Sequence, residues 1–182
     1  MTGHKFGAPK GVGALYVRGK VPFSPFVYGG HQDRARRGGT ESVPLIVGMG
    51  KAAELARKHL PSYDKKVRAL RDALEDGILK GIPNTELNGH KTQRLANTSN
   101  ITFHAVESEA LLILLDQEGI CASSGSACLA DSEESSHVIK AMKPESAASR
   151  QMIRFSLGVA NTNSDIEKAL RFLYQATRTL NE

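Results

Sequence analysis

Apolar residues recur at helical spacing in the middle of the chain, between residues 43 and 80. Positions three and four apart lie on one face of a helix, so this stripe predicts an amphipathic helix from about residue 63 to residue 80. Pro44 suits the first turn of a preceding helix that reaches about residue 59, and Pro61 is expected to separate the two helices. The stripe consists of Val67, Leu70, Leu74 and Ile78. We interpret both helices as scaffold.

Shorter segments on either side predict a mixture of strands and helices. In the strand at 152–157 the apolar residues share one face, so Arg154 points away from that face. Ser164 and Glu167, three positions apart, form a capping box that is expected to open a final helix. The other predicted elements are strands at 12–18 and 100–103 and helices at 107–118 and 136–142.

Composition narrows the class of protein. With 182 residues and 40% hydrophobic content, the chain can bury a core as one domain or two small ones. No apolar run approaches the roughly 20 residues of a membrane span, and the first ten residues lack the apolar core of a secretory signal. Two cysteines without a CxxC pair favour a reducing, cytoplasmic location. Despite the net charge of +5, aromatic residues are few, so we expect no nucleic acid or membrane as partner.

Two glycine-rich stretches could bind an anion. Residues 2–13 place Lys5 and Lys10 among glycines, which could hold a phosphate, although the spacing does not match a P-loop and a plain loop is the alternative. Residues 29–41 combine arginines, glycines and the hydroxyl of Thr40. Guanidinium charge with free N–H groups fits an anion site, and a solvated basic loop is the alternative.

A run of small residues leads to Cys128. Small side chains leave the backbone free and the sulfur unshielded, as a nucleophile on a loop requires. The alternative is a flexible connection with an incidental thiol. We expect Cys121 to be a buried structural thiol, and His104 and His137 to be structural or surface residues.

Four segments in order along the chain resemble the cysteine desulfurases, most closely the NifS/IscS branch. Residues 2–13 (TGHKFGAPKGVG) resemble the lysine segment of that family, and 39–41 (GTE) resemble its phosphate-contacting loop. Residues 123–128 (SSGSAC) resemble its persulfide loop, and 153–158 (IRFSLG) its substrate-carboxylate strand. The resemblance covers essentially all 182 residues.

The resemblance implies a role for each matching residue. Lys5 would hold pyridoxal 5′-phosphate covalently and move protons, with Thr2 and His4 at or beside the phosphate. Thr40 would contact the phosphate from the second subunit of a homodimer. Arg154 would bind the substrate carboxylate. The Cys128 thiolate would attack the sulfur of L-cysteine, which leaves a persulfide on the protein and releases alanine.

The implied fold is the C-terminal part of a fold-type I, pyridoxal-dependent, aminotransferase-like α/β enzyme. Residues 1–41 would be the edge of the large cofactor-binding domain, 42–81 a helical connector and 82–182 a small α+β domain. Family members are longer, and their first half carries a histidine, an aspartate and a glutamine around the cofactor ring. No matching segment is present here, so we expect a truncated or split chain with an exposed apolar face near residues 12–17.

The sequence also departs locally from the family. Thr2 stands where the family has serine, and Leu129-Ala130-Asp131 replaces a usual Thr or Ser and Gly after the cysteine. The first change keeps a hydroxyl, so the phosphate contact can survive. The second is expected to affect partner contacts more than the attack itself.

Several readings stay open. The implied partners are an iron–sulfur scaffold or another sulfur acceptor, together with a second copy or an N-terminal fragment. A non-catalytic persulfide carrier or scaffold-binding fragment is the alternative function, and selenocysteine lyase chemistry is a close variant. We expect no resident metal, because the spacing of Cys121 and Cys128 matches no standard cluster motif. Cys128 could still serve as a transient iron–sulfur ligand.

Overall fold

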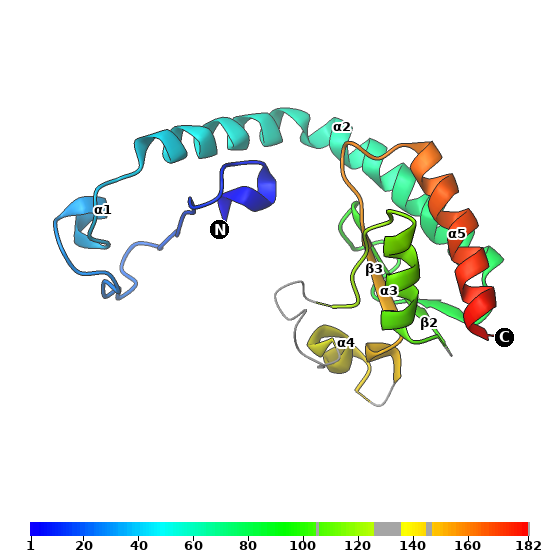
Figure 1. Ribbon diagram of the computed structural model, residues 1–182. Helices are drawn as coiled ribbons and strands as arrows, with labels where there is room; N and C mark the ends of the chain where they lie inside the picture. The colour runs from blue at the N-terminus through cyan, green and yellow to red at the C-terminus, as the bar shows by residue number, and fades with distance from the viewer. Residues whose placement is uncertain (105, 126–135, 145–146, 182) are drawn as a thin grey trace. The chain divides into compact units, whose positions relative to one another are not determined.

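The structure, a computed structural model, describes residues 1–104, 106–125, 136–144 and 147–181 (Figure 1). The chain divides into two compact units, Met1–Pro61 and Ser62–Glu182. They are called unit 1 and unit 2 below, and each is described by itself.

The helix α2 (Val43–Gly81) runs without interruption through both units, with Pro61 inside it. The expected break at Pro61 is therefore wrong. Proline removes one backbone donor and leaves the carbonyl of Arg57 without its helical partner. Both residues are exposed, so water can hydrate that carbonyl and the helix continues.

Unit 2 is built on an antiparallel sheet in the order β1-β2-β3. The strands are β1 (Thr85–Leu87), β2 (Thr98–Phe103) and β3 (Met152–Ser156). Leu87 lies opposite Ile101, and Ile101 lies opposite Ile153, so one apolar row crosses all three strands on the core face. The predicted strands at 100–103 and 152–157 are confirmed, and β1 was not predicted.

Helices cover this sheet (Figure 1). They are α3 (Ser108–Gln117), α4 (His137–Met142), the 3₁₀ turn η3 (Ala147–Ser149) and α5 (Asn163–Asn181). The main core joins α2, α3 and α5 to the sheet, and its fully buried side chains include Val67, Ile78, Ile101, Leu111, Leu115, Ile153 and Leu173. A small second cluster, made of Ile139, Ala148 and Met152, joins α4 and η3 to β3.

The cap of α5 lies earlier than expected. Thr162 Oγ1 accepts from the backbone N–H of Asp165 at 3.3 Å, and the Asp165 carboxylate accepts from the N–H of Thr162 at 2.8 Å. This reciprocal pair is a capping box with aspartate as its acid, and it places Ser164 inside the helix. The expected Ser164–Glu167 box is wrong, because the Thr162–Asp165 pair begins the helix first.

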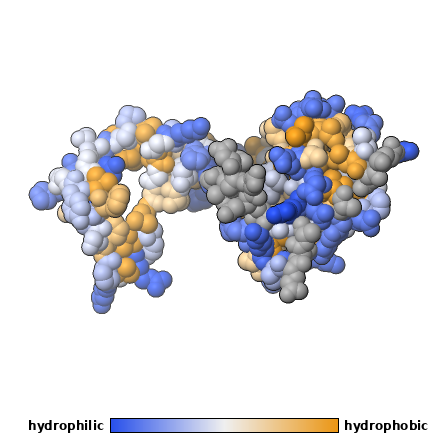
Figure 2. All heavy atoms as spheres, turned by 60° about the horizontal axis from the view of Figure 1, so that its bottom comes forward, coloured by the Kyte–Doolittle hydropathy of each residue, from blue (hydrophilic) through white to orange (hydrophobic). Residues whose placement is uncertain are grey.

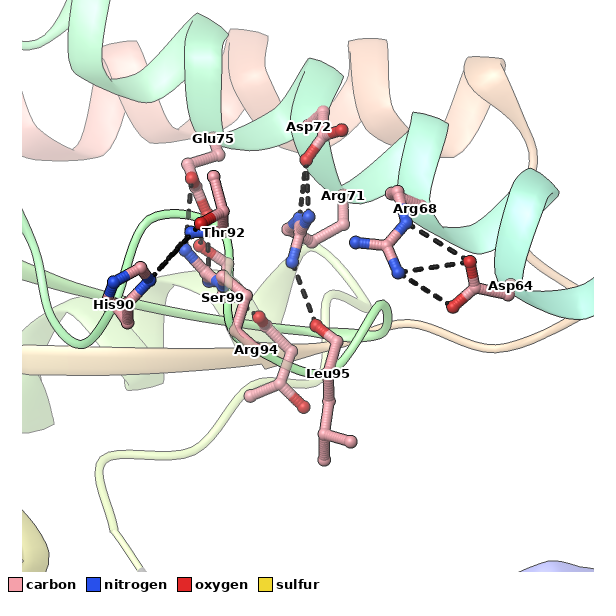
Figure 3. Close-up of polar contacts among 11 residues, drawn as sticks. Asp64, Arg68, Arg71, Asp72, Glu75, His90, Thr92, Arg94, Leu95 and Ser99 are labelled. Atoms are coloured by element: carbon pink, nitrogen blue, oxygen red, sulfur yellow. Dashed lines mark hydrogen bonds and ion pairs between the residues drawn. The ribbon is translucent and has the colours of Figure 1, made fainter.

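Polar side chains fasten the β1–β2 connection to α2 (Figure 3). Glu75 and Arg94 form an ion pair at 3.0 Å, with side chains only 12% and 11% exposed. Ser99 donates to the same carboxylate at 2.7 Å. Close by, Arg71 donates to the carbonyl of Leu95 at 2.9 Å. Together these contacts hold the connection, and thereby the start of β2, against the helix.

Unit 1 has little regular structure besides its part of α2. It contains the 3₁₀ turn η1 (Gly3–Phe6) and the short α1 (Gln32–Ala35). The predicted strand at 12–18 is wrong: the described residues of this stretch form only an isolated bridge, between Thr2 and Gly13. A strand needs a neighbour to complete its hydrogen bonds, and here the apolar residues are left exposed, with Tyr16 84% accessible. Figure 2 shows hydrophobic residues, in orange, on the surface of this unit and also on that of unit 2.

Among the helices that the structure describes, none is long and apolar enough to cross a membrane. The described residues contain no group of three or more His, Cys, Asp or Glu arranged to hold a metal ion.

Candidate functional site

The residues expected to hold a cofactor lie on one short turn of unit 1. Thr2, His4 and Lys5 flank Gly3, whose N–H donates to the carbonyl of Val12 at 2.9 Å. A Cβ added at Gly3 would lie 2.9 Å from that same oxygen, so only glycine allows the two segments to approach this closely. Thr2, His4 and Lys5 are all exposed, which leaves an amine, an imidazole and a hydroxyl accessible within one turn.

Thr40 lies on the arginine-rich loop of unit 1, residues 29–41. Gly38 is buried and donates to the carbonyl of Val27 at 2.9 Å, and Gly39 has a φ of 108°. A side chain would strain that conformation, so the glycine pair sets the path of the chain into Thr40. A cleft of about 660 Å³ opens beside this loop, and its walls include Leu15, Phe23, Phe26, Arg34, Arg36 and Arg37.

Arg154 lies on β3 in unit 2. Its backbone exchanges two hydrogen bonds with Ser123, with Arg154 N to Ser123 O at 2.6 Å and Ser123 N to Arg154 O at 3.2 Å. The side chain is half-buried, and no described residue accepts a hydrogen bond or forms an ion pair with its guanidinium. A guanidinium free on a polar face of a sheet suits a carboxylate ligand.

Two asparagines, not predicted from the sequence as site residues, lie beside Arg154. Asn100 lies directly opposite Arg154 in the β2–β3 register, and Asn88 donates to the side chain of Asn100 at 2.8 Å. The available signal was the alternation of β2, where Asn100 and Thr102 fall on the face opposite Ile101. Polar residues at those positions distinguish this face of the sheet from the apolar core face.

The structure describes one of the two cysteines, Cys121. Cys128 lies outside the described residues. Cys121 is a free, exposed thiol, so the expectation of a buried thiol is wrong. Its neighbours Ile120 and Ala122 pack against the core, and in an extended segment the residue between them faces the other way, toward solvent.

One cluster of charges lies on β1. Lys143 lies 2.7 Å from one carboxylate oxygen of Glu86, and His104 lies 3.4 Å from the other. The ammonium of Lys143, and secondly the imidazole of His104, hold the pKa of Glu86 below its ordinary range. At neutral pH this carboxylate is therefore ionised and paired.

The family model for class-V aminotransferases matches residues 1–169. This chain belongs to the class-V aminotransferase family. The resemblance inferred from the motifs is thereby confirmed.

Within the class-V aminotransferases, the similar curated proteins bear cysteine desulfurase names. The chain is 54% identical over 173 residues to cysteine desulfurase 2 of Trichormus variabilis, covering 95% of this chain and 43% of that protein. It is 47% identical over 180 residues to cysteine desulfurase IscS of Methanosarcina thermophila, covering 99% and 44%. The chain thus spans less than half the length of these relatives.

Solved structures agree with the family. A NifS-like protein matches with a TM-score of 0.82 at 32% identity, covering 98% of this chain and 45% of that one. A NifS-like protein from Rickettsia africae matches with a TM-score of 0.74 over 85% of this chain and 40% of its own. The expected fold, part of a fold-type I class-V aminotransferase, is confirmed. The division at residues 41 and 81 and the individual site residues stay predictions.

Proposed function

We propose that this chain carries the lysine, arginine and cysteine of a cysteine desulfurase, which converts L-cysteine to L-alanine and keeps the sulfur as a persulfide. The observation that carries the proposal is the match of a class-V aminotransferase model to residues 1–169. Relatives named cysteine desulfurase, one of them 54% identical over 173 residues, narrow the reaction within that family.

The residues of unit 1 fit pyridoxal 5′-phosphate as cofactor. An exposed lysine amine can bond to its aldehyde, and the hydroxyls and imidazole of Thr2, Thr40 and His4 can bind its phosphate. The close approach of Gly3 to Val12 fixes the turn that carries Lys5. When bound, the cofactor supplies an electron sink for the substrate carbons. Lys5 then takes and returns protons at those carbons.

Arg154 binds the substrate carboxylate in this proposal. Its guanidinium is free of partners among the described residues, and its planar fork matches a carboxylate. The backbone pair with Ser123 also anchors the segment that leads to Cys128. Cys128 follows Ser123 by five positions, so a fully extended chain would carry it no more than about 18 Å from that anchor. The nucleophile is therefore tethered to the strand that binds the substrate.

The sulfur step balances without any added oxidant. The Cys128 thiolate attacks the sulfur of the substrate, an S–S bond forms and the C–S bond of the substrate breaks. The electron pair of the broken bond goes to carbon, which takes a proton and becomes the methyl group of alanine. The terminal sulfur stays on Cys128 as a persulfide, ready for transfer to a second thiol.

Two kinds of partner follow from this function. An iron–sulfur scaffold or another cytoplasmic sulfur acceptor would receive the persulfide. Because large apolar side chains of unit 1 are exposed, with Phe26 96% accessible, we propose that unit 1 packs against a second polypeptide segment. That segment is either a second copy, to which Thr40 would contribute, or an N-terminal fragment.

The first test is cofactor binding and turnover by the purified chain. Pyridoxal 5′-phosphate is expected to produce the visible absorption band of the lysine-bound cofactor, and Lys5→Ala should abolish it. Lys10→Ala is the matched control, because Lys10 is an exposed lysine in the same glycine-rich stretch. Alanine formed from L-cysteine is then measured. If the wild type gives no band, this chain does not hold the cofactor. If Lys5→Ala keeps the band, Lys5 is not the lysine that binds it.

The second test is the site of the persulfide. After treatment with L-cysteine, mass spectrometry should find an added sulfur on the wild type and on Cys121→Ser, but not on Cys128→Ser. An added sulfur that persists in Cys128→Ser removes that residue from its role. A persulfide accepted from an external donor by a chain that binds no cofactor would favour the carrier function instead.

A further inference from the structure

A polar row crosses the sheet of unit 2 at the level of Arg154. Arg154 lies opposite Asn100 on β2 and is bridged on its other side to Ser123. Asn88 follows β1 and donates its backbone N–H to the carbonyl of Asn100 at 2.8 Å. Residues directly opposite each other in an antiparallel pair have Cβ atoms about 5 Å apart on one face. Asn100 is thus the neighbour best placed to compete for the guanidinium.

An asparagine beside an arginine would ordinarily accept an N–H from it through its amide oxygen. In this row the amide of Asn100 is already engaged at both ends. Its oxygen accepts from Asn88 Nδ2 at 2.8 Å, and its own Nδ2 donates to the sulfur of Met152 at 3.1 Å. The guanidinium of Arg154, in contrast, has no partner among the described residues.

Asn88 is held in this orientation by its burial. It is only 5% exposed, and its Nδ2 donates both to Asn100 and, at 2.8 Å, to the hydroxyl of Thr102. Its own amide oxygen is buried without a partner among the described residues. A buried unpaired carbonyl is destabilising. Asn88 nevertheless keeps the orientation in which its amide nitrogen donates to both Asn100 and Thr102 and its oxygen has no described partner.

We propose that Asn88 and Asn100 are positioning residues for the substrate carboxylate: Asn88 holds the amide of Asn100 so that the fork of Arg154 stays free. The proposal rests on the assignment of Arg154 as the carboxylate-binding residue. Neither asparagine needs to touch the substrate. Removing Asn88 releases the Asn100 oxygen, which then accepts from Arg154 and competes with the ligand.

The test measures carboxylate binding on the full chain, without cofactor or turnover. The probe is L-alanine, which carries the same carboxylate as L-cysteine and no thiol. Its binding is followed by the NMR shift of the Arg154 Nε–H, assigned by its loss in Arg154→Lys. In the wild type we expect a saturable shift. Asn88→Ala should raise the Kd by roughly fivefold to tenfold, the effect of one competing hydrogen bond.

The double variant separates positioning from general damage. Without Asn100 nothing competes for the guanidinium, so Asn88→Ala/Asn100→Ala should return the Kd to near the wild-type value. A purely structural role predicts the opposite, because the double variant loses more contacts than either single variant. Thr177→Ala is the matched control: it removes a buried 2.7 Å hydrogen bond on α5, away from the row, and should leave the Kd unchanged.

A second variant covers the case in which Asn88→Ala does not fold. Asn100→Asp keeps the acceptor that Asn88 uses and places a carboxylate opposite Arg154. It should shift the Nε–H signal before any ligand is added and weaken L-alanine binding more than Asn88→Ala does.

Three results would overturn the proposal. They are a wild-type Nε–H that L-alanine does not shift, an unchanged Kd in Asn88→Ala, and a double variant as weak as that single variant. L-alanine binding with the expected pattern, but no alanine formed from L-cysteine, would contradict the desulfurase activity and leave the positioning pair intact.

Discussion

Unit 1 and unit 2 bury their apolar residues to very different degrees. The buried hydrophobic residues described in unit 1 are Ala8 and Ala52, whereas unit 2 contains a core that joins three helices to a sheet. Large side chains in unit 1 lie open, as Phe26 does at 96% exposure. Burial of apolar area is the main source of folding free energy. Unit 2 therefore has its own stabilisation, and the exposed patch on unit 1 is typical of a surface that another polypeptide covers.

The largest expected effect compares one residue type in both units. Phe103→Ala in unit 2 removes a side chain that is 2% exposed and should lower the free energy of unfolding by about 3–5 kcal/mol. Phe26→Ala in unit 1 should change it by less than about 0.5 kcal/mol. Urea unfolding of both variants, followed by circular dichroism, measures the difference. Equal losses would mean that unit 1 buries Phe26 in solution, and the contrast between the units would not hold.

A smaller effect is expected for two adjacent acids on α2. Glu75→Ala leaves the nearly buried Arg94 without its anionic partner and should lower the free energy of unfolding by about 3 kcal/mol. Asp76→Ala breaks an exposed pair with Lys80 and should lower it by less than about 1 kcal/mol. Thermal unfolding of both variants measures the two losses. A Glu75→Ala variant as stable as Asp76→Ala would show that water reaches the Arg94 pair.

The smallest effect depends on pH. The pKa of Glu86 is lowered in the folded state, chiefly by Lys143, so ionised Glu86 stabilises unit 2 above the unfolded pKa of about 4.3. That contribution is lost as the pH falls through the lower, folded pKa. Glu86→Gln should therefore be less stable than the wild type at neutral pH, and the two should converge in acid.

The effect at Glu86 should be small, because its side chain is 51% exposed and solvent screens the pair. Urea midpoints at several pH values measure it. Glu54→Gln, at an exposed pair in unit 1, is the control and should leave the midpoints unchanged. A constant gap between Glu86→Gln and the wild type at all pH values would contradict the linkage.

The sequence predicted helices and strands best where the spacing of apolar residues matches the buried face of the element. The stripe from Val67 to Ile78 forms the buried face of α2, and the alternation around Ile153 and Phe155 forms β3. It failed where tertiary context decides. Residues 12–18 have the composition of a strand, but among the described residues no partner strand completes it. Pro61 does not end a helix whose free carbonyl faces solvent.

The candidate site divides in the same way. Arg154 was placed by alternation, on the face away from the core, and the structure confirms that face. The asparagine pair could not be predicted, because a row across three strands depends on register, which one sequence does not specify. The bridge from Ser123 to Arg154 joins residues 31 positions apart, and no local pattern encodes such a pairing.

Helix α2 is continuous, but its two halves differ in burial. Its first half, in unit 1, is mostly exposed, and its second half is buried along one face in unit 2. Pro61 lies at that boundary and has no amide proton, so one backbone hydrogen bond of the helix is missing where burial begins. Fraying that starts at Val43 can stop at this gap without unravelling the half that packs on the sheet. Pro61 therefore separates a first half of α2 that can open locally from a second half that opens only when unit 2 unfolds.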